Sequence, residues 1–374
     1  MDDAIIYIGL AQSVFSAFLI YFKKPSLLAN KILGLWLFMI ALLFSLNVYK
    51  ISNEITIDLW PISANIIITF PVFLFLYTKY IVTEYKKFIL SDLIHFTPLI
   101  IGVGIAILYI PKDIDLYTPL IESFDDKLKA LSWIGYVFKF SIWFYSLYAL
   151  IIIYIYRTKT TSYYSFYSNK INLRWLVVLI VSFFIIYNLI IYISSTYHLS
   201  RLITHIERFR SGSLLIFVYI VSIWGFRQHQ LSSNVAPPDL NLNKKPSELD
   251  SERYTKSGLK DEQAEKYMQK LIDYMNNSLI WQENELSLAK LADETQIPKH
   301  YITQVLNEHI KKNFYTFVNE YRTEYAMKLI KSPKYKDYSF VAIAFESGFN
   351  SKTAFNIFFK KYTGMTPSEF KKKE

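Results

Sequence analysis

The chain has 374 residues, no cysteine, a formal net charge of +10, 52% hydrophobic residues and 19% charged residues. The absence of cysteine excludes a disulfide-stapled scaffold and a zinc-thiolate site. The charged fraction lies below the roughly 25% of typical soluble domains, which argues against a purely soluble globular protein. Residues 1–227 hold 19 basic and 12 acidic residues, whereas residues 228–374 hold 22 and 19. An apolar half therefore precedes a more charged, soluble half.

The apolar half contains seven runs long enough to cross a bilayer, for which a helix needs about 20 mostly apolar residues. The seventh run is short, which makes it the weakest of the set. The sequence thus predicts a seven-helix transmembrane bundle. Its spans are Ala4–Phe22, Ile32–Val48, Pro61–Val82, Leu93–Ile110, Leu131–Tyr156, Trp175–Tyr197 and Gly212–Phe226.

The orientation of the bundle follows from the lysines and arginines between the spans, because these residues are retained on the cytoplasmic side. With the N-terminus outside, the inner connections carry nine basic residues and the outer connections carry seven. This bias is modest. It favours an outside N-terminus, and seven crossings then leave the C-terminal half in the cytoplasm. The chain is therefore predicted to be a multi-pass membrane protein.

Polar residues inside the predicted spans have ordinary explanations. Lys79 and Lys139 lie a turn or two from a span end, where lysine side chains extend to the interface. Asn47, Asn65 and Asn188 are expected to form hydrogen bonds between helices. None of them indicates a ligand site.

The predicted domains are a membrane domain at 1–227, a flexible linker at 228–262 and a soluble domain at 263–374, with its core at 286–374. The linker lacks apolar periodicity and contains Pro237, Pro238 and Pro246, a composition typical of an extended segment. From Asp261 onward, apolar residues recur at three and four positions, which predicts an amphipathic helix. Residues 286–374 then carry 15 basic and 9 acidic residues. Basic charge is therefore concentrated at the C-terminal end.

This last region contains an internal repeat, since Leu286–Glu308 resembles Ser339–Lys361. Each copy predicts a short helix, a tight turn and a second helix. Gly348 suits a turn position with positive φ, where a side chain is strained. Its counterpart Gln296 is a less comfortable occupant. Between the copies, helical spacing of apolar residues from Phe314 to Leu329 predicts a rigid connecting helix.

The region resembles the DNA-binding domain of the AraC/XylS family of bacterial transcription regulators over about 90 of 374 residues. The similarity is carried by Leu291 and Ala292, by Asn313–Ile330, by Ile343–Phe349 and by Phe359–Phe370. The resemblance implies two helix-turn-helix units joined by a linker helix. The predicted fold class is therefore all-α, with the membrane bundle followed by this cytoplasmic domain.

The resemblance also implies that the exposed faces of the second helix of each unit contact DNA. Gln304 and Asn356 could pair with adenine, the lysines could meet guanine or phosphate, and Thr353 could touch a thymine methyl group. Ile357 departs from the polar or basic residue that such regulators often carry there. The candidate readers are Lys299, His300, Thr303 and Gln304 in the first unit, and Asn350, Ser351, Lys352, Thr353, Asn356 and Ile357 in the second.

Four further lysines are expected to contact phosphate and to set affinity more than sequence preference: Lys311, Lys312, Lys360 and Lys361. Each candidate has a plain alternative, because a polar residue on the outer face of a helix is usually only solvated. No catalytic constellation is found, and the six histidines do not fall at metal-ligand spacing. We therefore expect no enzyme activity, no metal and no cofactor.

Together with the resemblance, the sequence favours a transcription regulator in the inner membrane of a bacterial cell. Its bundle would sense a signal and its tail would bind double-stranded DNA. One rival is a membrane receptor or transporter-like protein whose tail binds a protein partner. A second rival keeps DNA binding but makes the membrane half a passive anchor. The expected partners are DNA, the lipid bilayer and an unknown small-molecule or protein signal. A homodimer is a further possibility that no residue pattern indicates.

Overall fold

The computed structural model describes residues 2–24, 26–53, 60–83, 87–109, 124–166, 173–196, 200–227, 259 and 261–373. Within these ranges the regular structure is helical, apart from one isolated antiparallel bridge between Tyr164 and Ser287. The chain divides into two compact units. One comprises Met1–Ile153 and Leu173–Ser233, and the other comprises Tyr154–Asn172 and Asn234–Glu374. The expected all-α fold class is confirmed.

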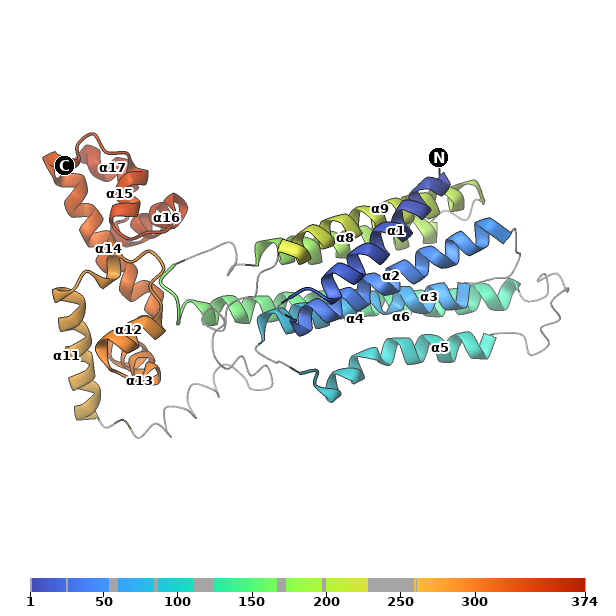
Figure 1. The fold of residues 1–374 in the computed structure, drawn as a ribbon, viewed down its shortest axis with the longest axis horizontal. Coiled ribbons are helices and arrows are strands. Elements are labelled where there is room, and N and C mark those ends of the chain that lie inside the picture. The colour runs from blue at the N-terminus through green and yellow to red at the C-terminus, as the bar shows by residue number, and fades with distance from the viewer. Residues whose placement is uncertain are drawn as a thin grey trace. The chain divides into compact units, whose positions relative to one another are not determined.

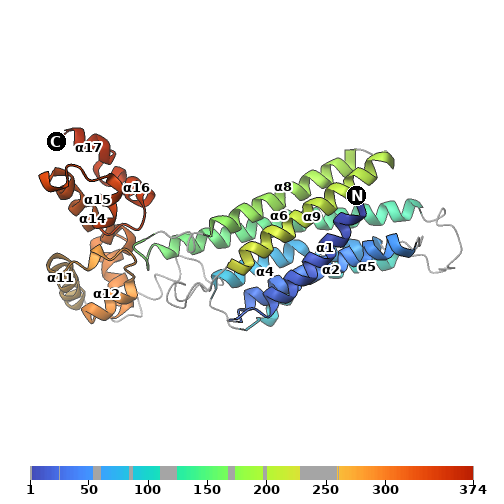
Figure 2. The same ribbon diagram turned by 45° about the horizontal axis from the view of Figure 1, so that its top comes forward.

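The first unit is a bundle of long apolar helices that run side by side (Figures 1 and 2). Among the described residues, seven helical stretches are long and apolar enough to cross a membrane. Its helices are α1 (Asp2–Tyr21), α2 (Leu28–Asn53), α3 (Trp60–Ile68), α4 (Phe70–Val82), the 3-10 helix η1 (Leu90–Phe96), α5 (Thr97–Tyr109), α6 (Phe124–Thr160), α8 (Arg174–Thr196) and α9 (Ser200–Arg227).

These stretches coincide with the seven runs predicted from sequence. The predicted ends Ile110 and Tyr197 lie outside the described residues, as does the linker up to residue 258. The seventh helix is longer than the predicted span: α9 has 28 residues, of which Phe209–Arg227 is the apolar stretch of 19 residues. Helix α6 is also longer than its predicted span, with 37 residues, and its last residues, from Tyr154, belong to the second unit.

The third span is two helices rather than one. A turn at Thr69 separates α3 from α4, and the Thr69 hydroxyl donates a hydrogen bond to the Ile66 carbonyl at 2.6 Å. Pro71 follows at the start of α4, and it lacks the N–H that a continuous helix would donate to the Ile67 carbonyl. The apolar pattern hides this break, because both halves of the span are equally hydrophobic.

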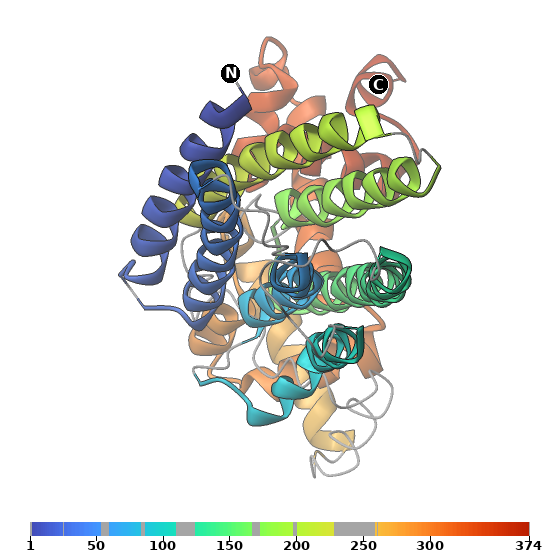
Figure 3. The same ribbon diagram turned by 90° about the vertical axis from the view of Figure 1, so that its right-hand side faces the viewer.

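The core of the first unit is aromatic. Trp36 of α2 is fully buried, and its ring lies 5.1 to 6.5 Å from those of Phe70, Phe73, Phe183 and Phe217, which come from α4, α8 and α9. Figure 3, an end-on view of this unit, shows α1 and α2 side by side. They approach closely at Gly9, where an added Cβ would lie 2.5 Å from the Phe44 ring.

The outward faces of this bundle are also apolar. Large hydrophobic side chains stand more than half exposed on several helices, among them Phe18, Leu108, Phe140 and Val178. Soluble proteins rarely present contiguous apolar surface of this kind, whereas a lipid-facing surface requires it. The distribution of side chains therefore fits a membrane protein, as the lengths of the helices do.

Two polar residues of the spans make specific contacts. The Lys79 amino group contacts the buried carboxylate of Asp92 at 2.6 Å, and the Tyr80 hydroxyl donates to the same carboxylate at 2.8 Å. Asp92 lies in the next helical element, η1, and the sequence did not indicate this pairing. Asn188 does join two helices, since the Trp143 indole N–H donates to its side-chain oxygen at 3.0 Å.

The second unit consists of short helices around two apolar clusters. Helix α14 joins them, and Figure 1 shows it running from α12 and α13 to α15 and α16. The helices are α11 (Asp261–Asn277), η2 (Ile280–Gln282), α12 (Leu288–Thr295), α13 (Lys299–Gln304), the π-helical turn η3 (Val305–Ile310), α14 (Phe314–Lys331), η4 (Pro333–Tyr335), α15 (Phe340–Glu346), α16 (Lys352–Thr363) and α17 (Pro367–Lys373).

Candidate nucleic-acid interface

The first helix-turn-helix unit comprises α12, a tight turn, and α13 with its π-helical continuation. Ser287 caps α12, since its side chain accepts a hydrogen bond from the Lys290 N–H at 3.3 Å. Gln296 makes the turn with φ of +53°, and Pro298 precedes α13 without any side-chain cap. The apolar residues on the inner face of this helix-turn-helix unit are buried: Leu288, Leu291, Ala292, Ile302, Val305 and Leu306.

The candidate readers of the first helix-turn-helix unit differ in their exposure to solvent. Lys299 and His300 are exposed and Thr303 is half-buried. Gln304 is only 6% exposed, and its amide donates to the Glu308 carboxylate at 2.8 Å. The expectation that Gln304 lies on an exposed face is therefore wrong. The neighbouring helix α11 packs against both α13 and η3, and so removes one side of this recognition helix from solvent.

The second helix-turn-helix unit, formed by α15, its turn and α16, is more regular. Ser339 caps α15 by accepting from the Ala342 N–H at 3.1 Å, and Ser351 caps α16 by accepting from the Ala354 N–H at 3.2 Å. Gly348 makes the turn with φ of +85°, as predicted. An added Cβ at Gly348 would lie 2.6 Å from the Trp281 carbonyl oxygen. Helix α16 then runs for 12 residues without interruption.

Half of the candidate readers of the second helix-turn-helix unit are exposed. Lys352 and Thr353 are exposed, and Ile357 is 63% exposed, while Asn350, Ser351 and Asn356 are half-buried. The Ser351 hydroxyl oxygen is engaged in the cap. An isoleucine this exposed at the middle of a helix costs apolar solvation in the free protein, and this cost is recovered when the side chain meets an apolar group of a partner.

The four lysines expected to contact phosphate differ in their surroundings. Lys311, Lys360 and Lys361 are exposed. The amino group of Lys312 contacts the Glu320 carboxylate at 2.6 Å, so part of its charge is neutralised within the domain. Because phosphate binding depends on net positive charge, Lys312 is the weakest of the four candidates.

Sequence reasoning missed the residue that joins the two helix-turn-helix units. Arg322 of α14 is fully buried, and its guanidinium donates to the Trp281 carbonyl at 2.6 Å and to the Glu283 carbonyl. It also lies 5.9 Å from the Phe349 ring in the second turn. Burial lowers the pKa of Arg322 to about 9, so the group remains charged at neutral pH. A polar residue on the inward side of α14, four positions after buried Val318 and four before buried Ala326, is the signal that could have identified it.

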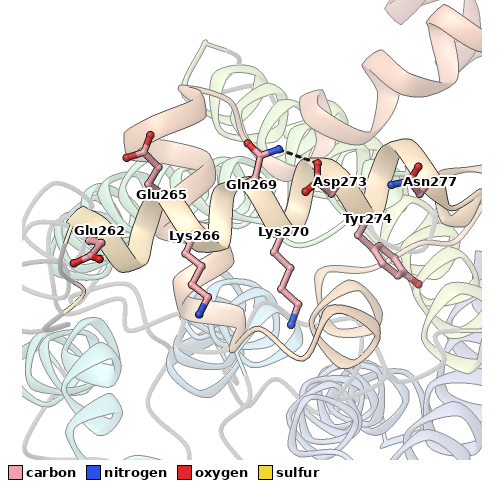
Figure 4. Close-up of a pocket in the computed structure, with 8 residues that line it drawn as sticks. All are labelled: Glu262, Glu265, Lys266, Gln269, Lys270, Asp273, Tyr274 and Asn277. Atoms are coloured by element: carbon pink, nitrogen blue, oxygen red, sulfur yellow. Dashed lines mark hydrogen bonds between the residues drawn. The ribbon is translucent and has the colours of Figure 1, made fainter.

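The exposed face of α11 has a different character. Figure 4 shows Lys266 and Lys270 extending to one side of the helix and Glu265 and Gln269 to the other. Gln269 donates to the Asp273 carboxylate at 2.8 Å, within the same face. Because the charges alternate in sign and do not converge on one point, this face is a solvated surface rather than a ligand site. Among the described residues, no cluster of His, Asp and Glu could hold a metal ion.

Comparison with known proteins agrees with this geometry. A family described as "Helix-turn-helix domain" matches residues 291–373. The chain is also 39% identical over 75 residues to the uncharacterized transcriptional regulatory protein YesN of Bacillus subtilis (strain 168), which covers 20% of each chain. The chain therefore spans about a fifth of the length of this curated relative. No solved structure matches. The C-terminal region is thus an AraC-type helix-turn-helix domain, with two units joined by α14.

Proposed function

We propose that this chain is a bacterial transcription regulator that is held in the cytoplasmic membrane and binds double-stranded DNA through α13 and α16. The observation that carries the proposal is the presence of two helix-turn-helix units and seven membrane-length helices in one chain. The similarity to a transcriptional regulatory protein supports the DNA-binding part. Two recognition helices joined by one rigid helix suit adjacent segments of the major groove, which lie about 34 Å apart on one face of a duplex.

The readers do not contribute equally in this proposal. In α16, Lys352, Thr353 and Asn356 face solvent at least in part and can reach base edges, and Ile357 can contact a thymine methyl group. In α13, Lys299, His300 and Thr303 are the accessible readers. Gln304 reads DNA only if it exchanges its hydrogen bond to Glu308 for one to a base. We therefore expect α16 to carry more of the sequence preference than α13.

The test is DNA binding by the full chain in lipid nanodiscs, with an operator selected from random-sequence duplexes. Replacing Asn356 with Ala removes a bidentate base contact and should weaken operator binding by about 1 to 3 kcal/mol, roughly 5- to 150-fold, with little effect on random duplex. Ser368→Ala is the matched control, because Ser368 is exposed on α17, outside the candidate readers. Equal affinities of the two variants would contradict the role of Asn356.

Salt dependence separates DNA binding from the rival in which the tail binds a protein. Phosphate contacts release counterions, so the affinity must fall steeply as salt rises, and each lysine removed must lower the slope by about one. We expect this for Lys360→Ala and Lys361→Ala, and less for Lys312→Ala, because Lys312 is paired with Glu320. The absence of salt-dependent binding by the full chain would favour the protein-binding rival.

The membrane half is proposed to place the N-terminus outside the cytoplasm and the C-terminal domain in the cytoplasm. Reporters active only in the cytoplasm or only in the periplasm, fused after Gln228 and between Lys112 and Lys129, test this topology. A C-terminal domain outside the cytoplasm would remove the chromosome as its partner.

We also propose that the bundle senses a small-molecule or protein signal and that the chain acts as a homodimer. A stimulus can shift an equilibrium only through differential interaction with its two states. Replacing residues 1–227 with an unrelated membrane anchor should therefore make target expression independent of the stimulus. Expression that still responds would show that the membrane half is only an anchor.

A further inference from the structure

The short segment Thr161–Phe166 directly follows α6. It lies against the helix-turn-helix domain, within the compact unit formed by Tyr154–Asn172 and Asn234–Glu374. We call it the docking segment. Its backbone forms an antiparallel bridge with the segment before α12: the Ser165 N–H donates to the Leu286 carbonyl at 3.3 Å, and the Leu288 N–H donates to the Tyr163 carbonyl at 2.9 Å. At its start, the Thr161 carbonyl accepts from the Tyr315 N–H of α14 at 3.0 Å.

The centre of the docking segment is a buried polar site. The carbonyl oxygen of Ser165 accepts from the Arg322 guanidinium at 2.8 Å and from the Asn319 amide at 2.9 Å. The Ser165 hydroxyl accepts from Arg322 at 3.0 Å and donates to the Leu286 carbonyl at 2.8 Å. All three side chains are at most 1% exposed. Buried hydrogen bonds of this density specify one arrangement, because a buried polar group without a partner is costly.

Apolar side chains surround this polar centre. Tyr164 and Phe166 are buried at 5% and 9% exposure, and their rings are 5.6 Å apart. Tyr163 packs both against them and against the apolar core of the first helix-turn-helix unit. The docking segment therefore combines backbone pairing, buried polar contacts and apolar packing, as an extended peptide does when it binds to a folded domain.

Arg322, which binds the docking segment, is also the residue that joins the two helix-turn-helix units. Arg322 divides its donors among Ser165, the Asn319 side-chain oxygen and the Trp281 and Glu283 carbonyls. Its guanidinium lies over Phe349 of the second turn. Removing Ser165 would leave part of a buried guanidinium without an acceptor. The relative placement of the two recognition helices thus depends on a contact made by the docking segment.

We propose that the docking segment ties membrane helix α6 to the junction of the two helix-turn-helix units, and that its docked state is the one that binds DNA. Helix α6 ends at Thr160, one residue before the docking segment, so a rotation or shift of α6 acts on it directly. The chain then has a second connection between its two halves besides the linker at 228–262. DNA affinity follows docking, because two recognition helices must keep one spacing to occupy adjacent major-groove segments.

Docking is tested by a cysteine pair, Tyr164→Cys with Ser287→Cys, in the full chain in native membranes. These positions face each other as a non-hydrogen-bonded antiparallel pair, whose Cα atoms lie about 4.5 Å apart. This distance lies within the range of disulfides. The natural chain has no cysteine, so no other disulfide competes. A protease site inserted between residues 228 and 258 allows the linker to be cut.

After oxidation and cleavage, the two fragments of the double variant should remain linked on a non-reducing gel and separate on a reducing gel. Each single-cysteine variant is the control and should separate on both. Separation of the double variant without reductant would overturn the proposal, because the docking segment would not then lie at Ser287. This part of the test does not depend on DNA binding.

The coupling to DNA rests on the proposed function and is tested with Ser165→Leu, whose side chain does not fit the buried site. Operator affinity in nanodiscs should fall by about tenfold or more, a typical coupling energy between two sites. Ser162→Leu is the matched control, because Ser162 lies in the same segment but is half-buried and outside the hydrogen bonds of Arg322. Ser165→Ala, which removes only the hydroxyl, is a milder variant that should lower the affinity by a smaller factor if Ser165→Leu fails to fold.

Equal operator affinities for the Ser165 variants and Ser162→Leu would overturn the coupling. If the unmodified chain binds no DNA while the cysteine pair still cross-links, the proposed function fails and docking stands. If operator affinity falls only in the Ser165 variants and the cross-link forms, both the docking and its coupling to DNA are supported.

Discussion

The two helix-turn-helix units form the same tight turn with different residues. In both, the N–H after the turn donates to a carbonyl five residues earlier: Ile297 to Ala292 at 3.2 Å in the first unit, and Phe349 to Ala344 at 2.9 Å in the second. The left-handed position is Gln296 in one and Gly348 in the other. The recognition helix that follows is uncapped and partly π-helical in the first unit, and capped and regular in the second.

This difference shows where each unit obtains its stability. The second unit has local signals that agree: a glycine at the turn, serine caps on both helices and a glycine at the end of α16. The first unit has weaker local signals, and it is supported by contacts from outside, with α11 packed on its recognition helix and the docking segment paired with its first helix. A unit that depends on external contacts is the one that such contacts can regulate.

The largest predicted effect comes from removing the residue that both units share. Arg322→Ala leaves the buried Trp281 carbonyl without its guanidinium donor, and an orphaned acceptor costs about 1 to 3 kcal/mol. It also removes one donor from the Glu283 carbonyl, which keeps the Leu286 N–H, and one from the Ser165 carbonyl, which keeps the Asn319 amide. The space left by the buried side chain adds the cost of a cavity. We expect a loss of about 3 kcal/mol or more in the free energy of unfolding of the C-terminal domain. Pulse proteolysis of the detergent-solubilised chain in urea, followed with a C-terminal epitope, measures it.

The control for this prediction is Lys328→Ala, which removes an exposed positive charge from the same helix. Its effect should be within about 0.5 kcal/mol, as for most surface substitutions. A similar loss in both variants would mean that the charge of α14, rather than the hydrogen bonds of Arg322, stabilises the domain.

The next largest effect is expected at the turn of the second unit. Gly348→Ala places a Cβ 2.6 Å from the Trp281 carbonyl oxygen and 2.7 Å from the Gln282 Cα, and both are backbone atoms that cannot move aside cheaply. Added to the strain of positive φ, the overlap should cost about 2 to 4 kcal/mol. The same proteolysis assay tests this value. A cost below about 1 kcal/mol would show that η2 and the second turn are not in fixed contact.

A smaller loss is predicted for the cap of the second recognition helix. Ser351→Ala removes the side chain that accepts from the Ala354 N–H, which should cost about 1 kcal/mol of stability. Ser351→Asp should retain most of it, because aspartate also caps helices well. If Ser351→Asp preserves stability but weakens DNA binding, the new charge repels phosphate, and this would place the start of α16 close to the DNA backbone.

Much of this organisation is predictable from the sequence, since long apolar runs and spaced local signals specify the spans, the turns and α14. Three features are not. The docking segment binds largely through backbone groups, which leave no pattern in the sequence. The buried Lys79–Asp92 pair joins two elements whose packing the apolar pattern does not define. The burial of Gln304 depends on where α11 packs, and periodicity within one helix gives no information about a neighbouring helix.

The smallest predicted effect is a gain, at the turn of the first unit. Gln296→Gly relieves the strain of φ at +53° but loses the hydrogen bond from the Gln296 amide to the Asp293 carbonyl, and it increases the freedom of the unfolded chain. We expect a net stabilisation of about 0.5 kcal/mol, opposite in sign to Gly348→Ala. A loss of more than about 1 kcal/mol would show that the side chain of Gln296 holds the turn. The two turns would then be stabilised by different means, a side-chain contact in the first and a glycine backbone in the second.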